Sequence, residues 1–305
     1  MKKVLLSVLI VCLCFVNVFA SAQSEKVDGK LTVVATTTML NDLVKVIGAD
    51  KVQSEGLMGI GIDPHGYQAT AGDVQKMQNA DVVVYNGLHL EGKMGEIFEN
   101  LDKLGKEVIV AEKGLDKEDI LADPLNPGVT DPHIWFNVEI WADVAKYVTE
   151  RLCEIDSANA DYFKANYERY AEQLELLDHY SEEMFASIPE GQRYLVTAHD
   201  AFNYLGKEYG LTVKGIQGIS TESEAGTKDV SVLADFITDN KIKAIFVESS
   251  VPRKTVESLQ EAVAARGFEV AIGGELNSDS LGPDVDSTYL SSVKANVDTI
   301  VNALR

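Results

Sequence analysis

Three of the five histidines in this chain share one sequence context, in which a histidine follows an expected strand or precedes an expected helix. His65 and His133 each end an Asp-Pro-His tripeptide, and His199 follows the apolar segment 193–197. Neutral imidazole is a common ligand for zinc, manganese and iron ions. A preceding proline restricts the backbone and lowers the entropy cost of presenting a ligand. The repeated pattern predicts a metal site, although a single such histidine is more often a capping or hydrogen-bonded loop residue.

The two other histidines have weaker contexts. His89 comes after the expected strand 81–85, so we expect a loop residue, with a place beside the metal or on its path as the alternative. His179 lies inside a long helical pattern and is expected to be an ordinary helix residue. Cys153 is the only cysteine beyond residue 22, which excludes zinc sites built on two or more cysteines.

These residues must be positioned by secondary structure, and apolar segments alternate with helical patterns along the chain. Strands are expected at residues 31–37, 52–58, 81–85 and 107–111, and again at 193–197, 211–216, 244–247 and 268–272. Such alternation is typical of parallel β/α architecture. Ligands of open parallel sheets bind beyond the carboxyl ends of the strands. The three histidines are therefore expected to meet in a cleft between two β/α halves.

A long helical pattern without glycine or proline separates the two halves. It covers residues 157–188, with apolar residues at a 3–4 spacing and Ser157 as the expected N-cap. At 1.5 Å per residue it would span about 48 Å, so we expect a rigid helix that packs on both halves. A coiled-coil stripe is the alternative. The expected division is a lobe at 31–156, this linking helix, and a lobe at 189–305.

The first 22 residues have the features of an export signal, namely two lysines, the apolar run Val4–Phe19 and a closing Ala-Ser-Ala. We expect export to the periplasm without a lipid, because neither Cys12 nor Cys14 follows small residues; an anchor through a lipid or an uncleaved signal is the alternative. The net charge of −21 argues against nucleic acid and anionic membrane surfaces as partners. No later segment has the roughly 18 apolar residues of a membrane-spanning helix.

Taken together, the motifs resemble the cluster A-I metal-binding receptors of ABC importers, in particular their TroA-like branch. The resemblance covers residues 31–305. It rests on both Asp-Pro-His tripeptides, on Thr-Ala-His-Asp-Ala-Phe at 197–202, and on the segments 215–221, 246–252 and 274–282. It implies an α/β fold of two (β/α)4 lobes with parallel sheets, bridged by one long rigid helix, with the metal site in the cleft between the lobes.

The resemblance also implies the ligands of that site. They would be His65 and His133 from the first lobe, and His199 and Asp279 from the second. Glu248, at the end of an expected strand, is a candidate hydrogen-bond acceptor for an imidazole N–H, or else a solvated helix cap. The implied function is not enzymatic. The receptor captures a divalent metal ion, acts as a monomer, and delivers the ion to the transmembrane permease of a metal ABC transporter.

The implied cargo is zinc or manganese, with Fe²⁺ as a further candidate. Three imidazoles and one carboxylate suit zinc best. Manganese-specialised relatives carry glutamate at the position of His199, whereas dedicated zinc relatives carry a His-rich loop that residues 116–131 lack. A zinc-dependent metallohydrolase and a surface adhesin are the alternative functions. Hydrolysis needs an open coordination position, which Asp279 would fill as a fourth protein ligand.

Overall fold

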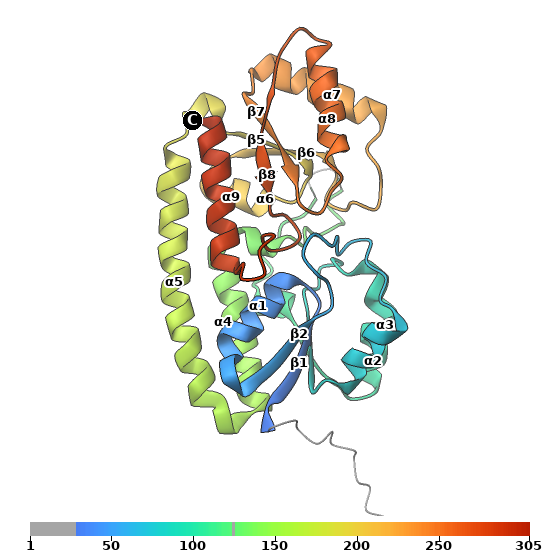
Figure 1. Ribbon diagram of the computed structural model, residues 1–305, viewed down its shortest axis with the longest axis vertical. Helices are drawn as coiled ribbons and strands as arrows, with labels where there is room; N and C mark the ends of the chain where they lie inside the picture. Colours follow the sequence, from blue (N-terminus) through green and yellow to red (C-terminus); the bar gives the residue numbers. More distant parts are fainter. Residues whose placement is uncertain (1–28, 124–125) are drawn as a thin grey trace, which may run out of the picture.

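The computed structural model describes residues 29–123 and 126–305, so the expected export signal at residues 1–22 lies outside the described residues. In the described ranges, strands and helices alternate in two groups stacked along the long axis of the molecule (Figure 1). Every pair of neighbouring strands in the sheets is parallel, which confirms the predicted α/β class with parallel sheets. None of the helices in these ranges combines the length and apolar character needed to cross a membrane.

The first group is a four-stranded sheet with the strand order β2-β1-β3-β4. Its elements are β1 (Leu31–Ala35), α1 (Thr38–Gly48), β2 (Val52–Gly56), α2 (Ala71–Asn79), β3 (Val82–Tyr85), α3 (Gly95–Lys103) and β4 (Glu107–Val110). The central strand β3 buries Val82, Val83 and Val84 completely, as a continuous apolar run in a parallel sheet should. Because the strands are parallel, the loops that follow them share one edge of the sheet.

The second group also contains four strands, which pair as β5 with β6 and β7 with β8, while β5 contacts β7. Its elements are β5 (Tyr194–His199), α6 (Asn203–Tyr209), β6 (Thr212–Gln217), α7 (Thr227–Asn240), β7 (Ala244–Glu248), α8 (Lys254–Ala264), β8 (Ala271–Leu276) and α9 (Tyr289–Leu304). The helices α7 and α8 lie on the side of these strands away from α9 (Figure 1).

The last strand differs from its prediction at residues 268–272, because β8 begins at Ala271 and continues to Leu276. Two adjacent glycines lie inside it, and glycines usually indicate the end of a strand. A Cβ atom on Gly273 would lie 2.7 Å from the ring of Phe246 and 2.8 Å from Ala303. The strand therefore packs too closely between its neighbours to carry a side chain there, and glycine is required by packing.

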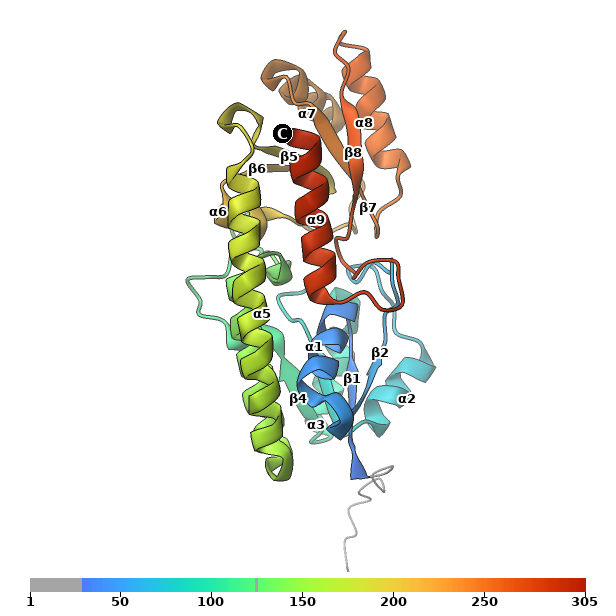
Figure 2. The ribbon, with the colours of Figure 1, turned by 60° about the vertical axis from the view of Figure 1, so that its left-hand side comes forward.

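One long helix, α5 (Ala160–Ala186), runs beside both groups, next to α9 and α4 (Val138–Ile155) (Figures 1 and 2). Its 27 residues span about 40 Å. Its buried side chains, among them Phe163, Tyr170 and Leu174, belong to one apolar cluster that includes residues of both groups. The two groups thus share a continuous core along this helix.

The start of α5 differs from the expected N-cap. Ser157 opens a short 3-10 turn, Ser157–Asn159, and the helix proper begins at Ala160 without a side-chain cap. The helix also ends at Ala186, two residues before the end of the apolar pattern. Ser181, a polar residue on its apolar side, is completely buried and donates its hydroxyl to the carbonyl of Leu177 at 2.8 Å. Its polar atom is satisfied within the helix.

Candidate metal centre

Four donor residues from distant parts of the chain meet between the two groups. His65 lies in the loop after β2, His133 directly precedes the 3-10 turn Ile134–Phe136, His199 is the last residue of β5, and Asp279 follows β8. One donor atom from each lies within 4.8 Å of one from every other. The structure therefore brings together all four residues that the sequence motifs and the resemblance suggested. All four are buried, with exposed fractions between 0 and 4%.

Four of the distances between these donor atoms are close to those of a tetrahedral zinc site. The Nε2 atom of His133 lies 3.2 Å from Nε2 of His65 and 3.3 Å from Nε2 of His199. The carboxylate oxygens of Asp279 lie 3.7 Å from Nε2 of His133 and 3.5 Å from Nε2 of His199. In a tetrahedron with bonds of about 2.0–2.1 Å, neighbouring ligand atoms are about 3.3–3.4 Å apart. Since the four donor atoms lie within 4.8 Å of one another, the side chains would have to draw closer together to hold one ion.

The two Asp-Pro-His tripeptides form the same local turn. The backbone N–H of His65 donates to Oδ1 of Asp63 at 2.9 Å, and that of His133 donates to Oδ1 of Asp131 at 3.0 Å. An aspartate that accepts from the backbone two residues on closes a compact Asx turn. Each turn therefore orients the backbone of its histidine through a hydrogen bond within the tripeptide.

Carboxylates behind two of the rings fix their orientation. Oδ1 of Asp131 lies 2.7 Å from Nδ1 of His133, and Oε2 of Glu248 lies 2.5 Å from Nδ1 of His199. Both carboxylates are buried, and each also accepts from the backbone N–H of its histidine. A carboxylate at Nδ1 leaves Nε2 as the metal-facing nitrogen and raises its basicity. Glu248 thus lies where an imidazole acceptor was anticipated, while Asp131 had not been singled out for this contact.

The pKa values of the donor residues show how strongly they interact. Burial, together with the neighbouring imidazoles, lowers the pKa of His65 to about 3 against the pull of Asp279. Burial also lowers the pKa of His199, but the carboxylates of Glu248 and Asp279 outweigh it and raise that pKa well above 6.5. For Asp279, burial raises the pKa, yet the three imidazoles outweigh it and hold it below its usual range. The carboxylate is therefore ionised and ready to bind a cation.

The loop that carries Asp279 is held by contacts that sequence reasoning missed. The hydroxyl of Ser250 donates to Oδ2 of Asp279 at 2.9 Å and lies 2.7 Å from the hydroxyl of Ser278. Oδ1 of Asp279 is buried and has no hydrogen-bond partner among the described residues, as a ligand atom facing an ion would be. Trp135 Nε1–H donates to the carbonyl of Ser278 at 2.9 Å and so ties this loop to the first half of the chain.

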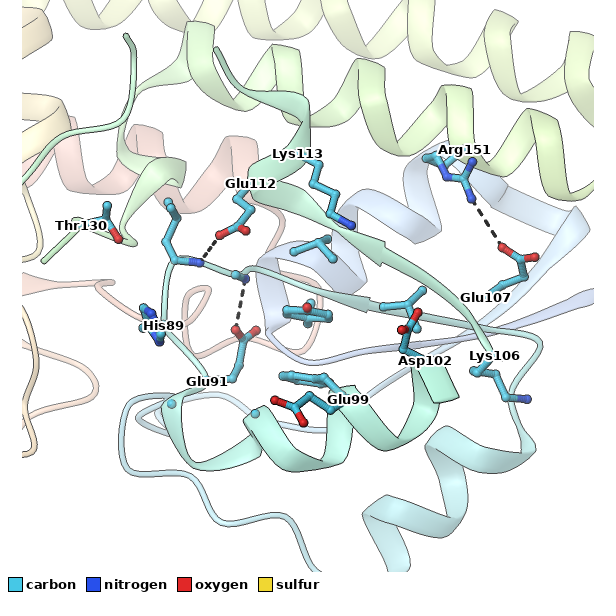
Figure 3. Close-up of a pocket in the computed structure, with 18 residues that line it drawn as sticks. His89, Glu91, Glu99, Asp102, Lys106, Glu107, Glu112, Lys113, Thr130 and Arg151 are labelled. Atoms are coloured by element: carbon cyan, nitrogen blue, oxygen red, sulfur yellow. Dashed lines mark hydrogen bonds and ion pairs between the residues drawn. The ribbon is translucent and has the colours of Figure 1, made fainter. Parts of the chain in front are cut away.

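The remaining histidines lie elsewhere. His179 is exposed on α5 near Glu182 and Glu183. His89 is exposed in the loop after β3, with a left-handed φ of 62°. It lines a pocket of about 730 Å³ beside the edge strand β4 (Figure 3). None of the four clustered residues lines that pocket, whose wall mixes acids and bases such as the ion pair of Glu107 with Arg151.

Comparison with known proteins agrees with this geometry. The family described as ZnuA, zinc-uptake complex component A periplasmic, matches residues 33–303. The chain is 46% identical over 292 residues to the zinc-binding protein TroA of Treponema pallidum, covering 95% of this chain and 94% of TroA. It is 41% identical over 284 residues to the manganese-binding lipoprotein MntA of Bacillus subtilis, covering 92% of each.

The solved structure of periplasmic TroA from Treponema pallidum has the same fold, with a TM-score of 0.87 over 90% of this chain and 99% of that chain. The resemblance to the metal receptors of ABC importers is thereby confirmed. Because the family pattern and the relatives cover almost the whole described chain, this protein belongs to the family of periplasmic zinc-uptake components, which are transport binding proteins and not enzymes.

Proposed function

We propose that His65, His133, His199 and Asp279 are the ligands through which this protein captures one zinc or manganese ion for import. The observation that supports this most directly is the buried cluster of three imidazoles and one carboxylate, whose donor atoms lie within 4.8 Å of one another. A site with four protein ligands holds its ion firmly and leaves no open position for a reactive water. Such a site suits a cargo carrier.

The choice between metals follows from the donor set. Imidazole suits zinc better than it suits manganese, and the Irving–Williams order places zinc above manganese and Fe²⁺ at a site of given ligands. The likeness to a zinc-binding and to a manganese-binding protein supports both ions as cargo. We propose zinc as the preferred ion in competition and manganese as the ion carried when zinc is scarce, with Fe²⁺ as a further candidate.

The same proposal includes the partner, the place and the division of the chain. The loaded receptor acts as a monomer outside the cytoplasmic membrane and passes its ion to a transmembrane permease. Residues 1–22 direct export, and the lobes at 31–156 and 189–305 face each other across the site, joined through 157–188. The family's role in an uptake complex supports a permease partner, and the lipoprotein among the relatives supports a membrane anchor as one form.

Metal analysis of the purified protein tests this function. The chain is stripped with a chelator, dialysed against equimolar Zn²⁺, Mn²⁺ and Fe²⁺ without oxygen, and analysed for bound metal. We expect one ion per chain, predominantly zinc, and one manganese ion per chain when manganese is offered alone. Less than about a tenth of an equivalent of any of these metals would contradict the proposal. Elution as a dimer in gel filtration would contradict the monomer.

A further inference from the structure

The four donor residues lie behind other parts of the protein, so an ion cannot reach them unless something moves. His133 and His199 are completely buried, Asp279 is 2% exposed and His65 is 4% exposed. His65 lines a cavity of about 240 Å³. The ring of His65 is therefore the side of the site that lies nearest to open space.

This smaller pocket lies between the two halves of the molecule. The first half contributes His65, Lys93 and Thr130 to its wall, and the second half contributes Ser220 and Glu222 from the loop between β6 and α7. It adjoins the larger pocket beside β4, since the two share wall residues that include His89 and Thr130. Both of these residues lie at the same end of the larger pocket (Figure 3).

The loop between β6 and α7, residues 218–226, is held to the first half by two polar contacts. The hydroxyl of Thr221 donates to Oδ2 of Asp63 at 2.6 Å. The ammonium of Lys93 lies 2.5 Å from Oε1 of Glu222. Both contacts join residues more than a hundred positions apart, and the Lys93–Glu222 pair lies in the wall of the pocket that leads to His65. Opening this side of the site requires both to break.

We infer that the pocket beside His65 is the passage by which a metal ion reaches and leaves the site, and that loop 218–226 positions its closure through Lys93, Glu222 and Thr221. This inference rests on the proposed function. Neither Lys93 nor Glu222 is among the donor residues, so their ion pair stabilises the closed loop equally with and without metal. Breaking it lowers the barrier for entering and leaving ions alike. Association and dissociation then accelerate together, and the affinity stays the same.

Stopped-flow kinetics on the full protein test the inference, with Zn²⁺ as the probe. Association is followed by the fluorescence of the protein, and dissociation by transfer of zinc to a chromophoric chelator at rising concentrations. In Lys93→Ala and in Glu222→Gln we expect both rate constants to rise about two- to fivefold, the range for an exposed ion pair. Thr221→Val loses a hydrogen bond to a carboxylate, so in this variant we expect both rate constants to rise about tenfold. The dissociation constant should change less than twofold in all three.

Lys76→Ala is the matched control. Lys76 pairs with Glu55 at 2.7 Å and is exposed to a similar degree, but both residues belong to the first half. Unchanged rates in the loop variants would overturn the inference. So would a rise in dissociation alone, which would make the loop a latch on the loaded form. If the association rate constant rose in Lys93→Ala but fell in Glu222→Gln, the two charges would act by repelling or attracting the metal cation at long range and not by closing the loop. Failure of the wild type to bind zinc would refute the proposed function itself.

Discussion

The two Asp-Pro-His segments have the same three residues and the same turn, yet they differ in what surrounds them. Asp131 is completely buried, contacts Nδ1 of its own histidine and accepts from Asn203 through its other oxygen at 3.1 Å. Asp63 is half-buried and gives its second oxygen to Thr221 of the opposite half. Within the described ranges, no carboxylate lies at ion-pair distance from Nδ1 of His65.

The difference shows that one tripeptide serves two tasks. The segment at 131–133 fixes a donor ring inside the protein, with a carboxylate behind it that stabilises positive charge. The segment at 63–65 presents a donor ring at the side that faces a pocket, and its aspartate holds a loop of the other half. The local turn is the same in both segments. The partners around each segment therefore determine that 131–133 is rigidly held and that 63–65 is accessible.

Removing a donor ring has the largest expected effect and tests what the two segments share. We expect His65→Ala, His133→Ala and His199→Ala each to lower zinc affinity more than about 100-fold, beyond the loss usual for residues that only support a ligand. Competition with a chromophoric chelator measures the affinity. His179→Ala on the exposed side of α5 is the control and should bind like the wild type. Comparable affinity in all four variants would refute the ligand assignment.

Substitution of the aspartates has the next largest expected effect and distinguishes the two segments. We expect Asp131→Asn to lower zinc affinity about 10–100-fold, because the carboxylate behind His133 is lost. In Asp63→Asn we expect zinc affinity to fall less than about threefold, because asparagine keeps the turn and no carboxylate contact to the ring is lost. Isothermal titration with zinc measures both. Equal losses would mean that the turn itself is what supports the metal.

The release of protons on metal binding gives a further comparison between a ring with a carboxylate at Nδ1, His199, and a ring without one, His65. The raised pKa of His199 keeps that ring protonated near pH 7 in the metal-free protein, so zinc must displace its proton. His65, with a pKa of about 3, is already neutral and releases none. Affinity should therefore rise as pH rises, by about tenfold per pH unit for one proton. Calorimetry in buffers of different ionisation enthalpy should count the protons, and zero released near pH 7 would contradict this.

The prolines have the smallest expected effect and test the shared turn. Pro64→Ala and Pro132→Ala should each lower the free energy of unfolding by about 0.4–1 kcal/mol, mainly because the unfolded chain gains freedom. Since the turns match, the two losses should agree. Urea denaturation of the metal-free protein measures them. Both prolines are buried, so a loss at Pro132 several times that at Pro64 would show that the partners around each turn, and not the turn alone, decide the role of the proline.

Much of the fold was predictable because its signals are local. Alternating strands and helices, the apolar run at β3 and the long glycine-free helix indicated the class and the element order. The start and end of β8 were not predictable in this way. Gly273 lies in that strand because Phe246 and Ala303, which are distant in sequence, leave no room for a side chain.

The candidate site was predictable to different degrees. The repeated tripeptide and the strand before His199 pointed to three rings, whereas Asp279 is one of 48 acids and was found only through the resemblance. The contact of Asp131 with the ring of His133 had a weak signal, since an aspartate two residues before a histidine can reach its ring. Ser250 and Trp135 had no such signal, because their contacts with the Asp279 loop depend on how two halves of the chain meet.

Because the core along α5 is continuous, metal binding is expected to affect the stability of the whole molecule. Because both halves share that core, they are expected to unfold together, and an ion held between them stabilises the whole chain. At a thousandfold excess of metal over the dissociation constant, this amounts to about 4 kcal/mol. The unfolded fraction, on which proteases act, then falls about a thousandfold. We therefore expect empty receptors to be degraded faster than metal-loaded ones.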